Sequence, residues 1–282
     1  MYRLQCHAPV TERIAVVDTY GNTNFTNFEI ESMTKIIAKF NQAGGVAKST
    51  LTQNLGYHLS RRNRRVLLVD MDPQATLTTF MGLVPRELEK TIYDAVVDEQ
   101  PLPIHEGING MDLAPTNIAL SLAESQLVNA DMRELRLHEA LEPIKDNYDY
   151  ILIDCPPSLG ILSYISLVAS NYILVPIETH FKSLEGSSEL LKTVARVKSK
   201  INRDLLVAGF VPTKYDSRNS HDTRALGTIQ ETLSQVGKVF PPVPRSTAFT
   251  DASEKRVPLL MHAPKHPAVN VLEELANGIE SI

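Results

Sequence analysis

Short apolar runs alternate along the chain with longer segments in which apolar residues recur at helical spacing. The runs are rich in Val, Ile and Leu, which is typical of parallel strands buried on both faces. Strands are predicted near residues 35–40, 65–69, 111–114, 149–153, 171–176 and 205–211, and helices near 49–62, 116–128, 133–146, 160–169, 183–200, 222–237 and 267–280. This order predicts an α/β fold, a doubly wound and mainly parallel sheet with helices on both faces.

Length and composition narrow the class of protein. A chain of 282 residues with 43% hydrophobic residues can bury one large core, so one main domain is expected. No apolar run reaches membrane-spanning length, and residues 1–32 lack the layout of a signal peptide, which predicts a cytoplasmic protein. Two cysteines, Cys6 and Cys155, are too few for a disulfide framework or a zinc site.

A glycine-rich segment, residues 41–50, lies between the first predicted strand and the first predicted helix. A loop that ends on a helix N-terminus presents backbone N–H groups and the positive end of the helix dipole, which suits a polyphosphate. Lys48 is placed to neutralise phosphate charge, and the Ser49 hydroxyl to hold Mg²⁺.

Carboxylates follow two of the other predicted strands. Asp70 and Asp72 end the run at 65–69, and Asp154 ends the run at 149–153, where Pro156 and Pro157 stop the strand. Functional groups collect at the carboxyl ends of parallel strands, so these carboxylates are candidate functional groups.

The three segments resemble the deviant phosphate-loop ATPases of the ParA/MinD type. The loop matches N-Q-K-G-G-x-x-K-[ST] except that Ala43 replaces the first lysine, and the later segments resemble D-x-D-P-Q and D-x-P-P. The resemblance implies an ATP hydrolase with ATP and Mg²⁺ as cofactors. In it, Asp72 orients the attacking water, Lys48 is catalytic, and the metal residues are Ser49, Asp70 and Asp154. The expected loop contacts to nucleotide are Gly44, Gly45, Val46, Ala47, Lys48, Ser49 and Thr50.

Two later segments extend the resemblance. Residues 176–186 are similar to the turn near the nucleotide-dependent dimer face, where Lys182 is the best substitute for the lysine missing at Ala43. A solvated lysine is the alternative interpretation. The loops after residues 205–211 and around 242–249 border the adenine in the family, which implies contacts from Thr213, Pro244 and Arg245.

Charge is distributed unevenly. The chain carries −5 overall, whereas residues 180–282 hold 14 basic against 11 acidic residues. Some of the basic residues fall in segments that form a sequence-independent DNA surface in ParA-type relatives. The DNA candidates are Lys198, Lys200, Arg203, Arg218 and Arg224. Solvated helix faces explain the same residues equally well.

The resemblance covers residues 33–282, so residues 1–32 are expected to be an N-terminal extension. Loss of the loop lysine is associated with the McdA branch, the maintenance of carboxysome distribution proteins. The implied function is an ATP-dependent homodimer that binds non-specific nucleoid DNA and positions a cargo, the carboxysome, through an adaptor that stimulates hydrolysis.

Two alternatives remain open. The absence of the loop lysine is compatible with an ATP-switched scaffold that does not hydrolyse ATP. A MinD-like membrane-positioning ATPase is the other, although its C-terminal helix should be basic and amphipathic, whereas residues 272–282 are acidic and contain a glycine.

Overall fold

The computed structural model describes residues 11–17, 23–29, 33–180 and 183–282. Contacts divide the chain into two units, Met1–Met33 and Thr34–Ile282. The first unit contains an antiparallel hairpin of β1 (Thr11–Val17) and β2 (Thr23–Glu29). Thr11 pairs with Glu29 and Val17 with Thr23, in a segment for which the sequence predicts no element.

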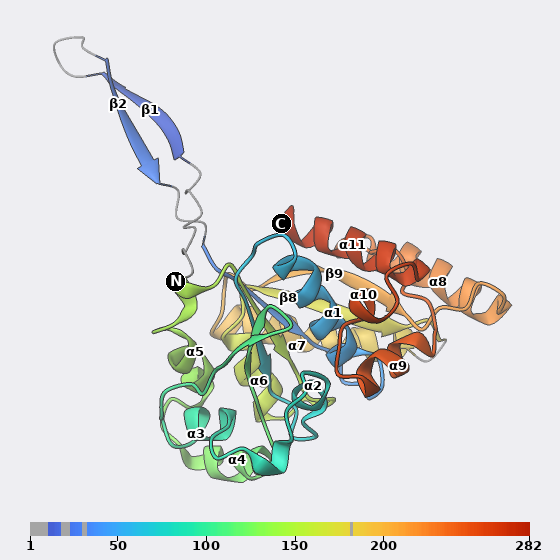
Figure 1. Cartoon of the computed structure of the whole chain (residues 1–282), viewed down its shortest axis with the longest axis horizontal. Helices are drawn as coiled ribbons and strands as arrows, with labels where there is room; N and C mark the ends of the chain where they lie inside the picture. Colours follow the sequence, from blue (N-terminus) through green and yellow to red (C-terminus); the bar gives the residue numbers. More distant parts are fainter. Residues whose placement is uncertain (1–10, 18–22, 30–32, 181–182) are drawn as a thin grey trace. The chain divides into compact units, whose positions relative to one another are not determined.

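The second unit is built on a seven-stranded sheet with the order β5-β6-β4-β7-β3-β8-β9 (Figure 1). All neighbouring pairs are parallel except β5 with β6. The strands are β3 (Lys35–Lys39), β4 (Val66–Asp70), β5 (His105–Ile108), β6 (Met111–Ala114), β7 (Tyr150–Asp154), β8 (Tyr172–Glu178) and β9 (Leu206–Thr213). The predicted doubly wound α/β fold is confirmed.

Helices cover both faces of this sheet (Figure 1). They are α1 (Lys48–Ser60), α2 (Thr76–Phe80), α3 (Ile92–Val96), α4 (Leu120–Gln126), α5 (Arg136–Leu141), α6 (Ile161–Val168), α7 (Ser183–Lys200), α8 (Ser220–Leu233), α9 (Ala248–Glu254), α10 (Leu259–His262) and α11 (Pro267–Glu280). Each predicted strand and helix has a counterpart. The predicted helix at 133–146 is shortened to α5, which ends before Pro143 because proline cannot continue a helix.

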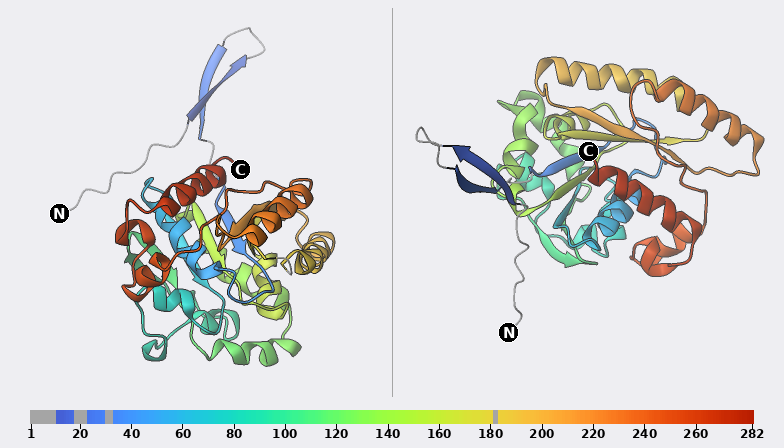
Figure 2. Two further views of the ribbon diagram at one scale, coloured as in Figure 1. Left: turned by 90° about the vertical axis from the view of Figure 1, so that its right-hand side faces the viewer. Right: turned by 90° about the horizontal axis from the view of Figure 1, so that it is seen from above.

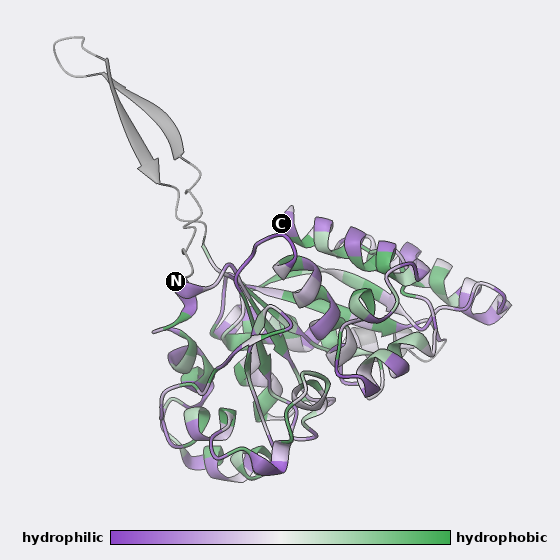
Figure 3. Cartoon of the chain, in the orientation of Figure 1, coloured by the Kyte–Doolittle hydropathy of each residue, from purple (hydrophilic) through white to green (hydrophobic). Residues whose placement is uncertain are grey.

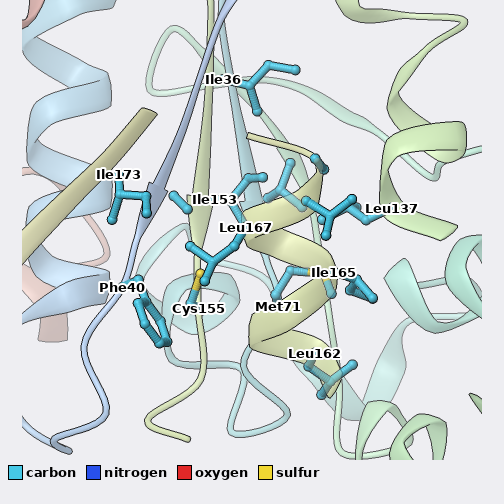
Figure 4. Close-up of a cluster of buried hydrophobic side chains, with 14 of the residues drawn as sticks. Ile36, Phe40, Met71, Leu137, Ile153, Cys155, Leu162, Ile165, Leu167 and Ile173 are labelled. Carbon is cyan, nitrogen blue, oxygen red and sulfur yellow. The ribbon is translucent and has the colours of Figure 1, made fainter. Parts of the chain in front are cut away.

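Two apolar layers form the core. One layer joins the sheet to α3 through α8, and the other joins it to α1, α2, α10 and α11. Residues alternate between the layers along β7, with Ile151 and Ile153 in the first and Tyr150 and Leu152 in the second. The first layer contains the strand residue Ile153 and, from α6, Leu162, Ile165 and Leu167 (Figure 4). The strands of the seven-stranded sheet are coloured mainly as hydrophobic in Figure 3.

Helices α1 and α11 lie beside one another (Figure 2), and ion pairs join α11 to residues just after α1. Arg62, just after α1, pairs with Glu273 and with Glu280, whose carboxylate lies 2.5 Å from the Arg62 Nη1 atom. Arg64 Nε lies 2.9 Å from the second oxygen of Glu280. The basic run after α1 therefore binds the acidic face of α11, and the apolar face of α11 is buried in the second layer.

The close approach of α1 to the sheet generates a stability prediction. A Cβ atom on Gly56 would lie 2.8 Å from Leu68 Cδ2 and 2.9 Å from Met111 Sδ. Gly56→Ala should therefore lower the free energy of unfolding by about 1–3 kcal/mol, measured by chemical denaturation. The matched control is Gly227→Ala in α8, where no atom lies within 4 Å. That change should stabilise the helix by about 0.5–1 kcal/mol. Equal effects at both glycines would contradict this account of the packing.

Candidate nucleotide-binding site

The segment between β3 and α1 is a tight loop held by Asn41. The Asn41 side chain donates to Pro176 O at 2.7 Å and accepts from the Ala43 N–H group at 2.9 Å. Gly45 and Ala47 both have positive φ, +73° and +69°. The left-handed conformation is free for glycine but costs an L-residue about 1–2 kcal/mol, so the surroundings impose it on Ala47.

Lys48 crosses back over this loop. Its ammonium donates to Asn41 O at 3.0 Å and to Ala43 O at 3.1 Å. Burial lowers the pKa of Lys48, while the charge of Asp154 acts in the opposite direction. Within the described part of the chain no side chain caps the N-terminus of α1, so the N–H groups of its first turn lack a side-chain acceptor there. The loop thus combines a cation with backbone donors, the pattern that binds phosphate groups.

Asp70 and Asp72 occupy different environments. Asp70 is fully buried, and one of its oxygens accepts from the Thr78 N–H group at 2.8 Å and from the Thr78 hydroxyl at 2.7 Å. Its other oxygen accepts from the Asp72 N–H group at 3.2 Å. Burial and the charge of Asp154 raise the pKa of Asp70. Asp72 is half-buried, lines the pocket described below, and accepts one hydrogen bond, from Gln74 N–H at 3.0 Å.

A buried row of charged residues lies across three strands under the loop. Lys39 on β3 is in register with Asp154 on β7, and Asp154 with Asp70 on β4. Among the described residues, neither the Lys39 ammonium nor either Asp154 oxygen has a hydrogen-bond partner. Burial raises the pKa of Asp154 to about 7, while the nearby Ser49 hydroxyl and the charge of Lys48 act in the opposite direction. Burial also lowers the pKa of Lys39 to about 7.

A pocket of about 590 Å³ opens above the loop and α1. Its lining contains the loop from Gly45 to Thr50 together with Asp72, Thr213, Pro244 and Arg245. The structure therefore brings together loop, carboxylate and adenine candidates that are far apart in the sequence. Thr213 donates its hydroxyl proton to Val46 O at 3.2 Å, so its side chain supports the loop from below.

Several lining residues are absent from the sequence-based set. Glu178, Lys214, Phe249 and Thr250 all face the pocket. Glu178 ends β8, and Lys214 directly follows β9, so their position at strand carboxyl ends is a signal that could have identified them. Phe249 lies on α9, which is too short for a periodicity signal.

Of the two residues Ala43 and Lys182, the structure describes the first. Ala43 is exposed and presents only a methyl group, and its backbone serves the contacts to Asn41 and Lys48. Lys182 lies outside the described residues.

The DNA candidates form two groups. Lys198 and Lys200 end α7, and Arg203 follows before β9 begins, whereas Arg218 and Arg224 lie beyond the other end of β9. A strand of eight residues spans about 26 Å, so the five side chains do not form one patch within a protomer. Arg218 also pairs with Asp216 through two contacts of 3.0 and 2.9 Å, with its side chain 89% exposed.

Comparisons with known proteins agree on the family. Residues 34–207 match the family AAA_31, described as an AAA domain. The chain is 38% identical over 251 residues to the sporulation initiation inhibitor protein Soj of Bacillus subtilis, covering 88% of this chain and 98% of Soj. It is 34% identical to the chromosome partitioning protein ParA of Caulobacter vibrioides, covering 88% of this chain and 94% of that protein.

Solved structures share the fold. A Mycobacterium smegmatis structure, described as cobyrinic acid a,c-diamide synthase with bound ATP analog and magnesium, is 32% identical with a TM-score of 0.78, covering 88% of this chain and 94% of that one. The ATP complex of Cyanothece McdA(D38A) is 22% identical with a TM-score of 0.80, covering 88% of this chain and 97% of that one. At that identity the second likeness concerns the fold alone.

The buried lysine of the charged row predicts a pH dependence of stability. The pKa of Lys39 falls from 10.5 to about 7 on folding, so between these values the unfolded chain binds the additional proton. The free energy of unfolding should then rise with pH by up to about 1.4 kcal/mol per unit. Between pH 7 and 9 the unmodified protein should gain about 2 kcal/mol more than Lys39→Met, measured by denaturant titration.

Asp154 changes this comparison only in its size, because the charge of Lys39 is one of the causes that lower the pKa of Asp154. In Lys39→Met the pKa of Asp154 should rise further, so the stability of the variant should fall with pH above pH 7, which widens the expected difference. Parallel pH profiles in the two proteins would show that Lys39 keeps its ordinary pKa in the folded state.

Proposed function

The chain belongs to the ParA family of AAA-domain ATPases, and on this premise we propose that it is a Mg²⁺-dependent ATPase that positions a cellular cargo as an ATP-bound homodimer on DNA. The observation that carries the proposal is the arrangement at the carboxyl ends of β3 and β7. A loop with Lys48 and free backbone donors lies beside a buried carboxylate, Asp154, with no partner among the described residues.

The residues at this place fit Mg²⁺. Both Asp154 oxygens lack a hydrogen-bond partner, and the Ser49 hydroxyl lies near them on the first turn of α1. Mg²⁺ is commonly held by one or two protein oxygens together with phosphates and waters, so a large protein ligand set is not required. When bound, Mg²⁺ neutralises charge on the phosphates. Asp70 already accepts three hydrogen bonds, so we assign it to orienting the loop after β4.

Other residues of the site have separate proposed roles toward the phosphates, the attacking water and the adenine. Lys48 exchanges its two carbonyl partners for phosphate oxygens, since the contact of an ammonium with an anionic oxygen is stronger than its contact with a neutral carbonyl. Asp72 lines the pocket with a half-buried carboxylate that can orient and accept a proton from water. Pro244 and Phe249 offer apolar surface for an adenine, with Arg245 at the edge.

The DNA, cargo and location belong to the same proposal. We propose, as the resemblance to ParA-type proteins implies, a protein in the cytoplasm that binds the nucleoid without sequence preference through exposed basic residues at one or both ends of β9. A carboxysome cargo rests on Ala43, the departure shared with the McdA branch, and it requires an adaptor protein that stimulates hydrolysis. The Lys182 contact across the dimer also remains a proposal.

Membrane positioning is disfavoured by the C-terminal helix. The apolar side chains of α11 are packed into the core, and Glu273 and Glu280 are paired with Arg62. No helix within the described segments has the length and apolar character needed to cross a bilayer. The nonhydrolysing scaffold stays as the second candidate, because Ala43 removes a charge that phosphoryl transfer normally uses.

The roles proposed for Lys48 and Asp72 predict different defects in two variants. Lys48→Ala should abolish ATP binding, because phosphate charge would be left without its cation. Asp72→Ala should bind ATP and dimerise normally but lose turnover, because it lacks the group that orients water. Nucleotide affinity, oligomeric state and phosphate release would be measured for both. Turnover at the unmodified rate in Asp72→Ala would reject its assignment, and no turnover in the unmodified protein, with DNA present, would favour the scaffold.

The DNA proposal predicts strongly salt-dependent binding without sequence preference. ATP-loaded protein should bind unrelated duplexes alike, and the double variant Arg218→Ala, Arg224→Ala should weaken binding to all of them. Removal of two phosphate contacts should lower the slope of log affinity against log salt by about 1.8. The comparison variant Lys198→Ala, Lys200→Ala removes equal charge at the other end of β9 and tells which end contacts DNA. Marked sequence preference, or binding that ignores ATP, would contradict the proposal.

A further inference from the structure

Ala43 leaves the nucleotide loop with one cation fewer than the loop pattern of the ParA/MinD-type ATPases contains. Among the residues that line the pocket, the positively charged side chains are Lys48, Lys214 and Arg245. Lys48 already has the role that the loop motif gives it. The pocket therefore contains a lysine, Lys214, for which the motif provides no function.

The backbone of Lys214 is held in an unusual conformation. Its φ is +56°, in the left-handed region that residues with side chains seldom adopt. The conformation is fixed from both sides, since Thr213 O accepts from Thr179 N–H at 3.0 Å and Tyr215 N–H donates to Val243 O at 3.1 Å. An unusual conformation imposed by neighbours at the edge of a pocket is a reason to look for a function.

This conformation directs the side chain over the glycine-rich loop. A methyl group built on Gly45 would lie 3.7 Å from the Lys214 Nζ atom, so the ammonium stands beside the loop backbone. Gly45 is the second of the two adjacent glycines that follow Ala43. Positive charge is thus present within the same protomer beside Gly45, two residues after the position whose lysine is missing.

The ammonium of Lys214 is weakly engaged. Its ion-pair partner is Glu178, whose Oε1 atom lies 3.6 Å away, beyond ordinary hydrogen-bond length, and the described residues provide no hydrogen bond to Nζ. Arg245 Nη2 approaches the same oxygen at 3.8 Å. The Lys214 side chain is 38% exposed. Glu178 can therefore keep Arg245 as a partner when Lys214 turns toward a ligand.

We propose that Lys214 contacts the phosphates of the nucleotide bound to its own protomer and supplies in cis part of the charge that Ala43 cannot provide. The proposal rests on the nucleotide function inferred above and adds a residue to that site. Glu178 acts as a holder of the lysine, which it releases to the more strongly charged phosphates. The contact with Lys214 should strengthen the binding of a triphosphate more than that of a diphosphate, because the contact is electrostatic.

Nucleotide binding to the monomer tests the proposal. Lys214→Met should weaken ATP binding by about tenfold, the usual order for losing one charge-assisted contact, and ADP binding by less. Glu178→Gln should strengthen ATP binding a few-fold by freeing the lysine, and Lys214→Arg should retain affinity near that of the unmodified protein. The matched control is Lys145→Met, which removes a lysine paired with Glu142 at 2.7 Å outside the pocket and should leave nucleotide affinity unchanged.

The outcomes separate this inference from the proposed function. If Lys48→Ala abolishes ATP binding while Lys214→Met binds ATP as the unmodified protein does, the inference is wrong and the ATPase assignment stands. If Lys182→Ala weakens ATP binding of the monomer and Lys214→Met does not, the inference is likewise wrong. If the unmodified protein binds neither ATP nor ADP, the proposed function fails first. Equal losses for ATP and ADP in Lys214→Met would indicate a structural role and would also overturn the proposal.

Discussion

Two carboxylates buried side by side at strand ends are the constraint on which this site depends. Asp70 and Asp154 are in register on neighbouring strands and almost fully removed from water. Buried charge of this kind is tolerated when opposite charge or hydrogen bonds lie close. Asp70 uses hydrogen bonds from Thr78, whereas Asp154 faces the two lysines Lys39 and Lys48. Among the described residues neither Asp154 oxygen has a hydrogen-bond partner, and the proposed Mg²⁺ site rests on this observation.

The loop between β3 and α1 follows from the same arrangement. Lys48 stands between the Asp154 charge and the carbonyl groups of the loop, so it connects the buried row with the open pocket. Because β3 lies between β7 and β8, the loop after β3 is bordered by Pro157 from the segment after β7 and by Glu178 from β8. Sheet order, rather than sequence proximity, thus assembles the site.

The sequence predicts the parts of the site that follow strand ends, because carboxylates after apolar runs and a glycine-rich turn are local signals. It also predicts a strand at residues 35–40, but the burial of Lys39 depends on pairing with β7, far away in the chain. A lone lysine after a strand is usually solvated, so the sequence does not distinguish Lys214. The basic residues near β9 were grouped by their sequence positions, whereas the strand between them separates the two groups.

The alanine at position 47 has a consequence for how the loop responds to its ligand. Glycine at such a turn lets a loop sample many shapes, and the ligand selects among them. Ala47 is held at a positive φ, and alanine has fewer accessible backbone conformations than glycine. The loop is therefore more rigid than one with glycine at this position. A rigid binding loop can discriminate between ligands only through the flexible side chains around it and the ligand atoms that they reach. Recognition of the number of phosphates is then a task for long, flexible lysines at the rim rather than for the backbone.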